Sequence, residues 1–482
     1  MVTDRRTFRW RIFGTFFLVT CAAFTAAQED ISLVADAEAC LHKAVAFFRT
    51  EVSTEGGYLW RYSADLSRRE GEGKATDTQA WVQPPGTPSV GLAFLDAYEK
   101  TGDRYYLDAA VETAHALVRG QLRSGGWDYR IEFDPEKRKK YAYRDGGATE
   151  GVNISTLDDN TTQAALRCLV KVDRALDFKD AAVHEAVLYG LDCLLKAQYP
   201  NGAWPQRYNR FLDPADYPVM PAKYPETWSR TYVKRAYTAD CTLNDNVLAD
   251  AVKLMWLANE VYGDKRYKES ALRAGEFLLL AQMPEPQPAW AQQYNAEMEP
   301  VWARKFEPPA VTGGESQQVM RVLLDFYQET NDVRYLHSVG RALEYFKKSR
   351  LSDGGLARFY ELKTNKPLYF TKAYELTYSD ADMPTHYGFK IGWGLQSVEA
   401  DYRAAKDGKP MPSYKKKTAS QQSVSAQEVK AIVKALDGRG AWVEKGRLLA
   451  QGENDATWEV ISCQTFIENV RILAGFIAAS KE

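Results

Sequence analysis

A short phrase of small residues followed by an aromatic residue recurs along the chain and constrains its fold more than any other feature. It reads GGYLWRYS, GGWDYR, NGAWPQRY, PAWAQQY and GGLARFY, beginning at residues 56, 125, 201, 288 and 354. Its centres, separated by 67, 77, 86 and 66 residues, are Trp60, Trp127, Trp204, Trp290 and Leu356. A repeat of this kind indicates a chain built from stacked copies of one supersecondary unit.

A second phrase lies between the aromatic phrases and predicts what each unit contains. TGDRYY, YGDKRY and TNDVRY each place an Asp after a Gly or Asn, with apolar residues at helical spacing on both sides. One helix then ends at the Gly or Asn, and the next begins at the Asp, which accepts free N–H groups of the first turn. Few stretches alternate with period two, so a large sheet is not expected. The predicted fold is all-α: an α/α toroid, an incomplete ring of helical hairpins, with its loop-borne active site at one mouth.

The N-terminus predicts export. A basic start (MVTDRRTFRWR), an apolar run (IFGTFFLVTCAAF) and a polar segment after small residues have the layout of a secretory signal cleaved after Ala27. The apolar run is short for a membrane span. We therefore expect a signal peptide at 1–27 and a secreted protein, periplasmic or extracellular, without stable membrane insertion.

The rest of the chain divides into a toroid at 28–414, a linker at 415–427 (KKKTASQQSVSAQ) and a C-terminal helical segment at 428–482 that packs on the toroid. Basic and acidic residues are nearly balanced, 62 against 64, so binding to nucleic acid is not expected. The five cysteines beyond the signal have no metal-binding spacing and are expected to be buried apolar residues. We expect a monomer.

Two acidic motifs stand just before predicted inner helices, at the same end of the ring. Asp158 and Asp159 lie in TLDDNTT, and Asp245 lies in TLNDNVLAD. Carboxylates flanked by amides form a hard-oxygen site that suits Ca²⁺. Each Asp could instead only cap its own helix. Two motifs at equivalent positions favour the metal site, and we expect the Asp158–Asp159 pair to cap its helix as well.

Three arginines lie on the loop side of the repeats. Arg207 follows the aromatic centre Trp204, while Arg304 and Arg358 lie close to later centres. We expect Trp204 and Arg207 to bind the substrate. Arginine binds carboxylates through two parallel hydrogen bonds; for each one taken alone, a solvated loop residue is the alternative. Acidic, basic and aromatic residues gathered at one mouth predict a site for an anionic sugar held partly through a cation.

Five motifs of the chain resemble, in this order, those of the family 10 polysaccharide lyases, which are pectate lyases. They are TLDDNTT, NGAWPQRY, TLNDNVLADAV, AWAQQYNAEMEPVWARKFEPPAVTGGES and GLARFYELKTNKPLYF. The similarity extends from Ala39 to Glu399, and the fourth motif is the most specific. The resemblance implies an α/α toroid that cleaves polygalacturonate, the acidic chain of pectin, by β-elimination with Ca²⁺, giving 4,5-unsaturated oligogalacturonides.

Carried over motif by motif, the resemblance also implies the roles of individual residues. The calcium-binding aspartates fall on Asp158, with Asp159 as the alternative one position along, and on Asp245. Arg304, in ARKFEPPAVTG, falls on the base that removes the C5 proton of the sugar. Arg358 falls on the arginine that contacts a substrate carboxylate.

The chain departs from the family pattern at two basic positions. Lys372 stands where the family typically has a second arginine, and lysine holds a carboxylate as a point charge and not as a fork. A further basic position falls near THYGFK, where His386 or Lys390 is the nearest candidate. These substitutions bear on how strongly the substrate is held.

Two other functions remain as alternatives. A helical-toroid glycoside hydrolase would use two carboxylates as acid and base, one of them in an apolar setting that raises its pKa. The polar neighbours of the three aspartates fit metal ligands better. A non-catalytic pectin-binding protein would bind the sugar without turnover, which the altered basic positions would permit.

Overall fold

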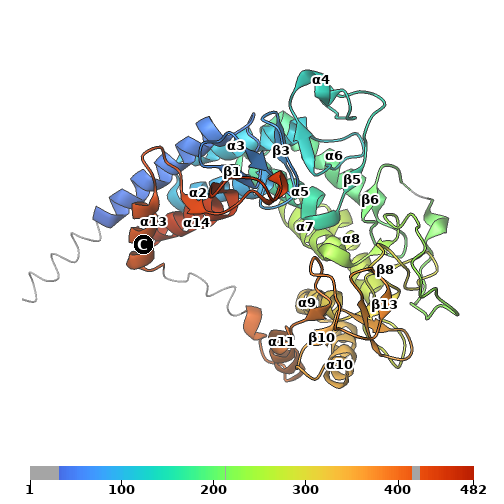
Figure 1. Cartoon of the computed structure of the whole chain (residues 1–482). Coiled ribbons are helices and arrows are strands. Elements are labelled where there is room, and N and C mark those ends of the chain that lie inside the picture. The colour runs from blue at the N-terminus through green and yellow to red at the C-terminus, as the bar shows by residue number, and fades with distance from the viewer. Residues whose placement is uncertain (1–31, 212, 415–423, 482) are drawn as a thin grey trace, which may run out of the picture.

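Helical hairpins follow one another along an arch (Figure 1). The computed structural model describes residues 32–211, 213–414 and 424–481. The expected signal segment at 1–27 lies outside these ranges, as do residues 415–423 of the expected linker. The arch confirms the predicted incomplete α/α toroid.

Four hairpins of the arch are continuous in sequence within the described residues. The first helix of each contacts the first helix of the next, so these helices form one row along the arch. The four pairs are α2 (Thr87–Thr101) with α3 (Arg104–Arg119), α5 (Thr161–Ala175) with α6 (Ala181–Ala197), α7 (Val247–Tyr262) with α8 (Lys265–Leu280), and α9 (Gly313–Thr330) with α10 (Val333–Lys348).

The turns inside three of the hairpins have the predicted caps. Asp103, Asp264 and Asp332 each accept a hydrogen bond from the backbone N–H two residues further on, at 2.9 Å. The residues before them end the preceding helices in the left-handed conformation, as at Gly102 and Gly263. The second phrase of the sequence thus marks the tip of a helical hairpin.

The aromatic phrase fixes the opposite end of each hairpin. Trp127, Trp204 and Trp290 are fully buried. Each indole N–H donates to a backbone carbonyl in the last turn of the preceding helix, at 2.8 to 2.9 Å. The last carbonyls of a helix have no N–H group of a following turn to accept from. In the first phrase the buried equivalent is Tyr58; Trp60, the centre expected from the sequence, lies two residues further and is partly exposed.

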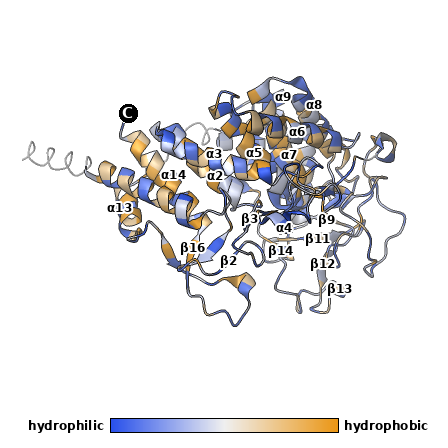
Figure 2. Ribbon diagram, turned by 90° about the horizontal axis from the view of Figure 1, so that it is seen from above, coloured by the Kyte–Doolittle hydropathy of each residue, from blue (hydrophilic) through white to orange (hydrophobic). Residues whose placement is uncertain are grey.

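A short antiparallel strand pair closes each hairpin beside this aromatic residue. One strand precedes the first helix and the other follows the aromatic phrase. The pairs are β3 (Gln79–Trp81) with β4 (Arg130–Glu132), β5 (Ser155–Thr156) with β6 (Arg207–Tyr208), β7 (Cys241–Thr242) with β8 (Gln293–Tyr294), and β9 (Ala310–Thr312) with β11 (Phe359–Glu361). These strands gather on one side of the helices (Figure 2).

The fourth hairpin carries additional strands on this side. β12 (Pro367–Phe370) and β13 (Leu376–Thr377) extend β9 and β11 into a four-stranded sheet of order β13-β12-β11-β9. β10 (Leu356–Ala357) pairs with β14 (Lys390–Ile391), and α11 (Gln396–Lys406) follows against α9 and α10. Short helical turns elsewhere are η1 (Phe48–Val52), α4 (Pro135–Arg138), η2 (Asp158–Asn160), η3 (Pro214–Asp216), η4 (Asn244–Asn246) and η5 (Leu449–Gln451).

The two ends of the chain together build one further hairpin. α14 (Cys463–Ala479) packs against α2, and β16 (Glu459–Ser462) pairs with β1 (Arg61–Ser63), which follows the helix at 32–47. The Phe48 and Phe466 rings stack across it.

The sheet at this end of the arch has the order β15-β16-β1-β2, with β2 at Arg69–Glu70 and β15 at Val443–Lys445. α13 (Ala426–Ala435) precedes β15, and the Trp442 indole between them donates to Ile432.

All five cysteines in the described residues are free and buried, as expected. Across the same ranges, no helix has the length and apolar character needed to cross a membrane.

The hairpin shared by the chain ends gives a stability prediction. Phe466 is 1% exposed and stacks on Phe48, so Phe466→Ala should lower the free energy of unfolding by about 3–5 kcal/mol. Leu449→Ala, at a side chain that is 75% exposed, is the control and should change it by less than about 0.5 kcal/mol. Denaturant unfolding measures both. If both substitutions changed the free energy of unfolding by the same small amount, the packing of this hairpin would be contradicted.

Candidate active site

Two matching turns carry the acidic motifs. η2 and η4 directly precede α5 and α7, and each contains two consecutive residues with left-handed backbone. Asp159 and Asp245 have φ of 49°, and the asparagines that follow them have φ of 59°. Asp and Asn adopt this conformation more readily than other non-glycine residues. The repeated Asp-Asn pair is therefore explained by the backbone of the turn.

These aspartates do not cap the helices they precede. Asn160 and Asn246 occupy the N-cap positions of α5 and α7, and neither helix has a side-chain capping bond. The expectation that Asp158 and Asp159 cap α5 is therefore wrong, because the left-handed turn puts Asn160 at the cap. Capping does not account for the acidic motifs.

The three aspartates converge on one point. One carboxylate oxygen each from Asp158, Asp159 and Asp245 lie within 4.8 Å of one another. Burial, followed by the charge of Asp158, raises the pKa of Asp159 to about 6 and that of Asp245 to about 8. The sequence suggested a polar setting, whereas the structure partly removes these groups from water. Such crowding of like charges is unfavourable unless protons or a cation neutralise it.

The donor set fits a hard divalent cation. Asp158 Oδ1 is buried without a hydrogen-bond partner among the described residues, so it is open as a ligand atom beside the other two carboxylates. Asn160 Oδ1, from the same turn, is also buried and has no partner there. Carboxylate and amide oxygens are the ligands that Ca²⁺ takes in proteins. The described residues thus offer Ca²⁺ an oxygen-only site.

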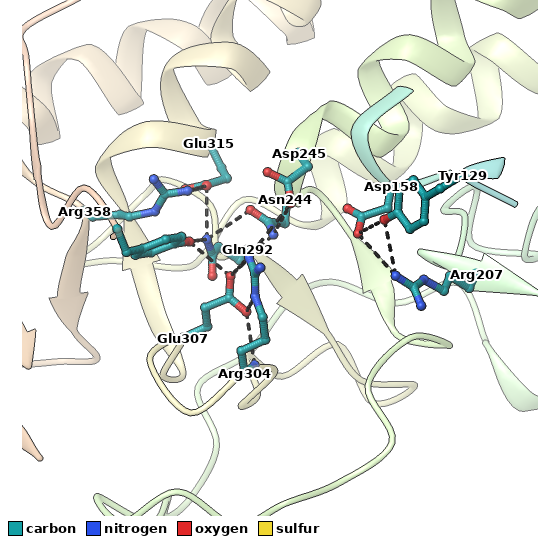
Figure 3. Close-up of polar contacts among 11 residues, drawn as sticks. Tyr129, Asp158, Arg207, Asn244, Asp245, Gln292, Arg304, Glu307, Glu315 and Arg358 are labelled. Atoms are coloured by element: carbon teal, nitrogen blue, oxygen red, sulfur yellow. Dashed lines mark hydrogen bonds and ion pairs between the residues drawn. The ribbon is translucent and has the colours of Figure 1, made fainter. Parts of the chain in front are cut away.

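Asp158 also joins the acidic cluster to the first arginine. Its Oδ2 accepts a hydrogen bond from the Tyr129 hydroxyl at 2.8 Å and lies 3.8 Å from Arg207 Nη2 (Figure 3). Arg207 in turn donates to the Tyr129 hydroxyl at 3.2 Å. Burial and the charge of Asp158 raise the pKa of Tyr129, so its hydroxyl keeps its proton. Tyr129 holds Asp158 so that its other oxygen stays open.

Arg304 lies on the other side of the cluster and is held by Glu307. Its Nε and Nη2 donate to the two Glu307 oxygens at 2.8 and 2.6 Å, and its Nη2 is 4.0 Å from Asp245 Oδ2 (Figure 3). The Glu307 side chain is 1% exposed. Burial lowers the pKa of Arg304, but the hydrogen bonds and charge of Glu307 raise it by more, so the net shift is upward. Arg304 Nη1 has no hydrogen-bond partner among the described residues.

A polar network links Arg304 to the third arginine. Gln292 Nε2 lies 3.2 Å from Asn244 Oδ1, 3.1 Å from Glu315 Oε1 and 3.1 Å from the Tyr387 hydroxyl. Glu315 accepts a hydrogen bond from Arg358 Nη2 at 2.7 Å. Arg358 is thereby oriented by a nearly buried carboxylate on the first turn of α9.

Two predicted substrate-binding residues lie elsewhere. Trp204 is fully buried, and its indole N–H is bonded to the Leu194 carbonyl, so the expectation that it contacts a substrate is wrong: it fills the core. Lys372 is exposed and forms an ion pair with Asp382 at 3.4 Å. No described contact joins Lys372 to the acidic cluster.

The two candidates for the further basic position are separated by the structure. The His386 ring packs edge-on against Phe306, two residues from Arg304, with ring centroids 5.1 Å apart. Lys390 forms ion pairs with Asp353 and Asp380 at 2.8 and 3.0 Å. His386 is therefore the candidate beside the site.

Tyr129, Gln292 and Tyr387 are site residues that the sequence did not reveal. The first two share a signal with Arg358: each stands two residues after the buried centre of an aromatic phrase, where the short strand begins. Aligning the phrases on their buried residue would have found them. Tyr387 belongs to no repeat, and nothing in the sequence singles it out.

The fold and this cluster define the class of protein. Hairpin loops at one mouth of an α/α toroid bring together open carboxylates and three arginines, an arrangement suited to an enzyme that acts on an anionic carbohydrate.

Comparison with known proteins gives one family match. Residues 121–354 match the family model of pectic acid lyase. This range contains the first four motifs and ends before Arg358 and Lys372. The match covers slightly less than half of the chain and agrees with the family that the motifs resemble. It supports an enzyme of the polysaccharide lyase class.

Solved structures with similar folds include three of note. A family 10 polysaccharide lyase from Cellvibrio cellulosa has 19% identity and a TM-score of 0.46, over 67% of this chain and 97% of that one. A mutant of a family 10 lyase from the same organism, in complex with trigalacturonic acid, has 20% identity and a TM-score of 0.45, over 67% and 98%. Cellobiose 2-epimerase from Bacillus thermoamylovorans B4167 has 14% identity and a TM-score of 0.46, over 90% and 95%. No curated protein sequence matches the chain.

The raised pKa values predict how Ca²⁺ binding depends on pH. Below a carboxyl's pKa, its proton competes with the cation, so affinity should rise as pH increases through about 6 for Asp159 and about 8 for Asp245. We expect the Kd for Ca²⁺ to fall at least about tenfold between pH 6 and pH 9, with protons released on binding. Isothermal titration calorimetry in two buffers measures both quantities. In Asp245→Asn, the Kd for Ca²⁺ should no longer depend on pH above about pH 7. A Kd of the unsubstituted protein that stays the same from pH 6 to pH 9 would contradict the prediction.

Proposed function

We propose that the chain is a secreted pectate lyase that cleaves polygalacturonate, an α-1,4-linked galacturonan, by Ca²⁺-assisted β-elimination with Arg304 as the base. One observation carries the proposal: Asp245 of a three-carboxylate cluster lies 4.0 Å from the Arg304 guanidinium. The pectic acid lyase match over residues 121–354 supports the substrate class. The proposed secretion rests on the signal pattern at 1–27.

In this proposal Asp158, Asp159 and Asp245 hold Ca²⁺. When bound, Ca²⁺ neutralises the carboxylate of the sugar at the cleavage site and so acidifies its C5 proton. The turns at η2 and η4 hold the aspartates in place before the ion arrives, because their left-handed backbone is fixed at the helix starts. Little reorganisation is then needed on binding.

The charge balance of the site explains why a cation would be required. When all are ionised, five carboxylates face three guanidinium groups, which leaves two excess negative charges. The carboxylates are those of Asp158, Asp159, Asp245, Glu307 and Glu315, and the guanidinium groups are those of Arg207, Arg304 and Arg358. A polyanion would be repelled by the ionised cluster alone, and one divalent cation cancels the excess.

Arg304 is the proposed base because of where it lies and how it is held. Glu307 accepts hydrogen bonds from Nε and Nη2, which fixes the orientation of the guanidinium group. Nη1 has no hydrogen-bond partner in the ranges that the structure describes. An arginine can accept the C5 proton only after losing one of its own, and Glu307 opposes that loss. Turnover should therefore increase with pH into the alkaline range.

Arg207 and Arg358 are the proposed carboxylate-binding residues on either side of the cluster. Arg207 comes from β6 of the second continuous hairpin, and Arg358 precedes β11 after the fourth. The Nε atoms of both arginines are buried and have no hydrogen-bond partner within the described part of the chain. Two such donors separated by the calcium cluster suit an extended chain of uronate sugars.

Removing the proposed base tests the mechanism. Arg304→Ala should lower kcat on polygalacturonate by at least about 100-fold and leave substrate binding nearly intact, because Arg304 acts on the proton. The assay follows the ultraviolet absorbance of the new C4–C5 double bond, with Ca²⁺ and then with a chelator. Arg334→Ala, which removes an exposed arginine of α10, is the control and should keep wild-type turnover.

The same assay separates the alternatives. Wild-type turnover by Arg304→Ala would remove Arg304 as the base. New reducing ends without ultraviolet absorbance would mean hydrolysis, with two of the aspartates as acid and base. Sugar binding without any product would mean a pectin-binding protein.

Removing a proposed ligand tests the calcium site. Asp245→Ala should raise the Ca²⁺ concentration needed for half-maximal activity by at least about tenfold, with activity partly restored at high Ca²⁺. Asp250→Ala, at a carboxylate three residues into the helix that pairs with Lys253, is the control. A loss that no Ca²⁺ concentration relieves would contradict a role as metal ligand only.

A further inference from the structure

Tyr387 contacts two of the site arginines with its ring and the carboxylate partner of one of them with its hydroxyl. It comes from the segment between β13 and β14, outside the repeated hairpins and outside residues 121–354. Its hydroxyl donates to Glu307 Oε1 at 3.0 Å and lies 3.1 Å from Gln292 Nε2. The Arg358 guanidinium carbon is 4.2 Å from its ring centroid, and that of Arg304 is 5.7 Å away.

The hydroxyl contact bears on Arg304 through Glu307. Glu307 is the buried carboxylate that receives Nε, Nη2 and the backbone N–H of Arg304. The Tyr387 hydroxyl is a further donor to the same carboxylate, and Glu307 Oε1 is shared between it and Arg304 Nη2. Burial and the charge of Glu307 raise the pKa of Tyr387, which therefore remains a donor. Loss of this donor would free Glu307 to shift, and Arg304 with it.

The ring contact bears on Arg358. A guanidinium over an aromatic face is attracted by the negative face of the ring. The ring is itself held by Phe306 and Phe389, with centroids 4.7 and 5.4 Å away. Arg358 thus has a fixed surface on one side and Glu315 at its Nη2.

We propose that Tyr387 is a positioning residue of the lyase reaction, which holds Arg304 through Glu307 and supports Arg358 with its ring, so that both guanidinium groups meet one substrate at a fixed spacing. The inference rests on the proposed function, since it assigns a role within that reaction. The two halves of the side chain have separable effects: the hydroxyl serves the chemical step, and the ring serves substrate binding.

Two substitutions separate these effects. Tyr387→Phe keeps the ring and removes the hydroxyl, so kcat on polygalacturonate should fall about tenfold or more while KM stays within about twofold. Tyr387→Leu removes the ring as well, so KM should also rise, by about threefold or more. Tyr378→Phe is the matched control: its hydroxyl donates to the largely buried Glu361 at 2.9 Å on the same segment, and its kcat and KM should not change.

A double variant tests whether the hydroxyl acts through Glu307. In a Glu307→Gln background, Tyr387→Phe should reduce kcat by far less than it does alone, because the carboxylate that the hydroxyl holds is gone. Losses that multiply would overturn the proposed route. A lowered Tm for Tyr387→Phe with unchanged kcat would make Tyr387 merely structural and would also overturn it.

The failure of this inference is distinguishable from that of the proposed function. If the wild type makes no unsaturated product with Ca²⁺, the lyase assignment fails and this inference fails with it. If the wild type is an active lyase and Tyr387→Phe matches it in kcat and KM, only the role of Tyr387 is overturned.

Discussion

The hydrogen bond from a buried indole to the end of the preceding helix is the interaction on which the site depends. Trp127, Trp204 and Trp290 each make it, and each is followed two or three residues later by a residue of the site: Tyr129, Arg207 and Gln292. A helix end has carbonyl groups without partners, and a buried indole N–H needs one, so each satisfies the other. The loop after the indole is therefore set rigidly relative to its helix.

The site built on these loops holds its charges in unfavourable proximity. Asp159 and Asp245 combine left-handed backbone with partly buried carboxylates near a third one. Local strain and unneutralised charge both cost stability, and both concentrate where a protein binds or reacts. The arginines offset this charge only in part, because Arg304 and Arg358 are already bonded to Glu307 and Glu315. In the proposed function, an external cation neutralises the remaining charge.

The sequence predicted the hairpins and the convergence of the acidic motifs, because both depend on local patterns. The Asp caps, the Gly turns and the repeated aromatic phrase each report one local structure, as at Asp103 and Trp127. It did not predict that Trp204 is buried in the core. An aromatic residue in a loop phrase gives the same sequence pattern whether its side chain faces a bound sugar or the core. Tyr387 could not be found, because its place in the site depends on how a long segment folds across the fourth hairpin.

The hairpin made from both chain ends has a consequence for the order of folding. The continuous hairpins can each form from neighbouring sequence, but α14 meets Phe48 only after nearly the whole chain has been made. Once the intervening hairpins have stacked, they bring the two ends within reach, so the entropy lost on closing this long loop is much reduced. The hairpin made from the two chain ends is thus expected to be the last part of the arch to form. A chain exported across a membrane N-terminus first would complete that step last, on the far side.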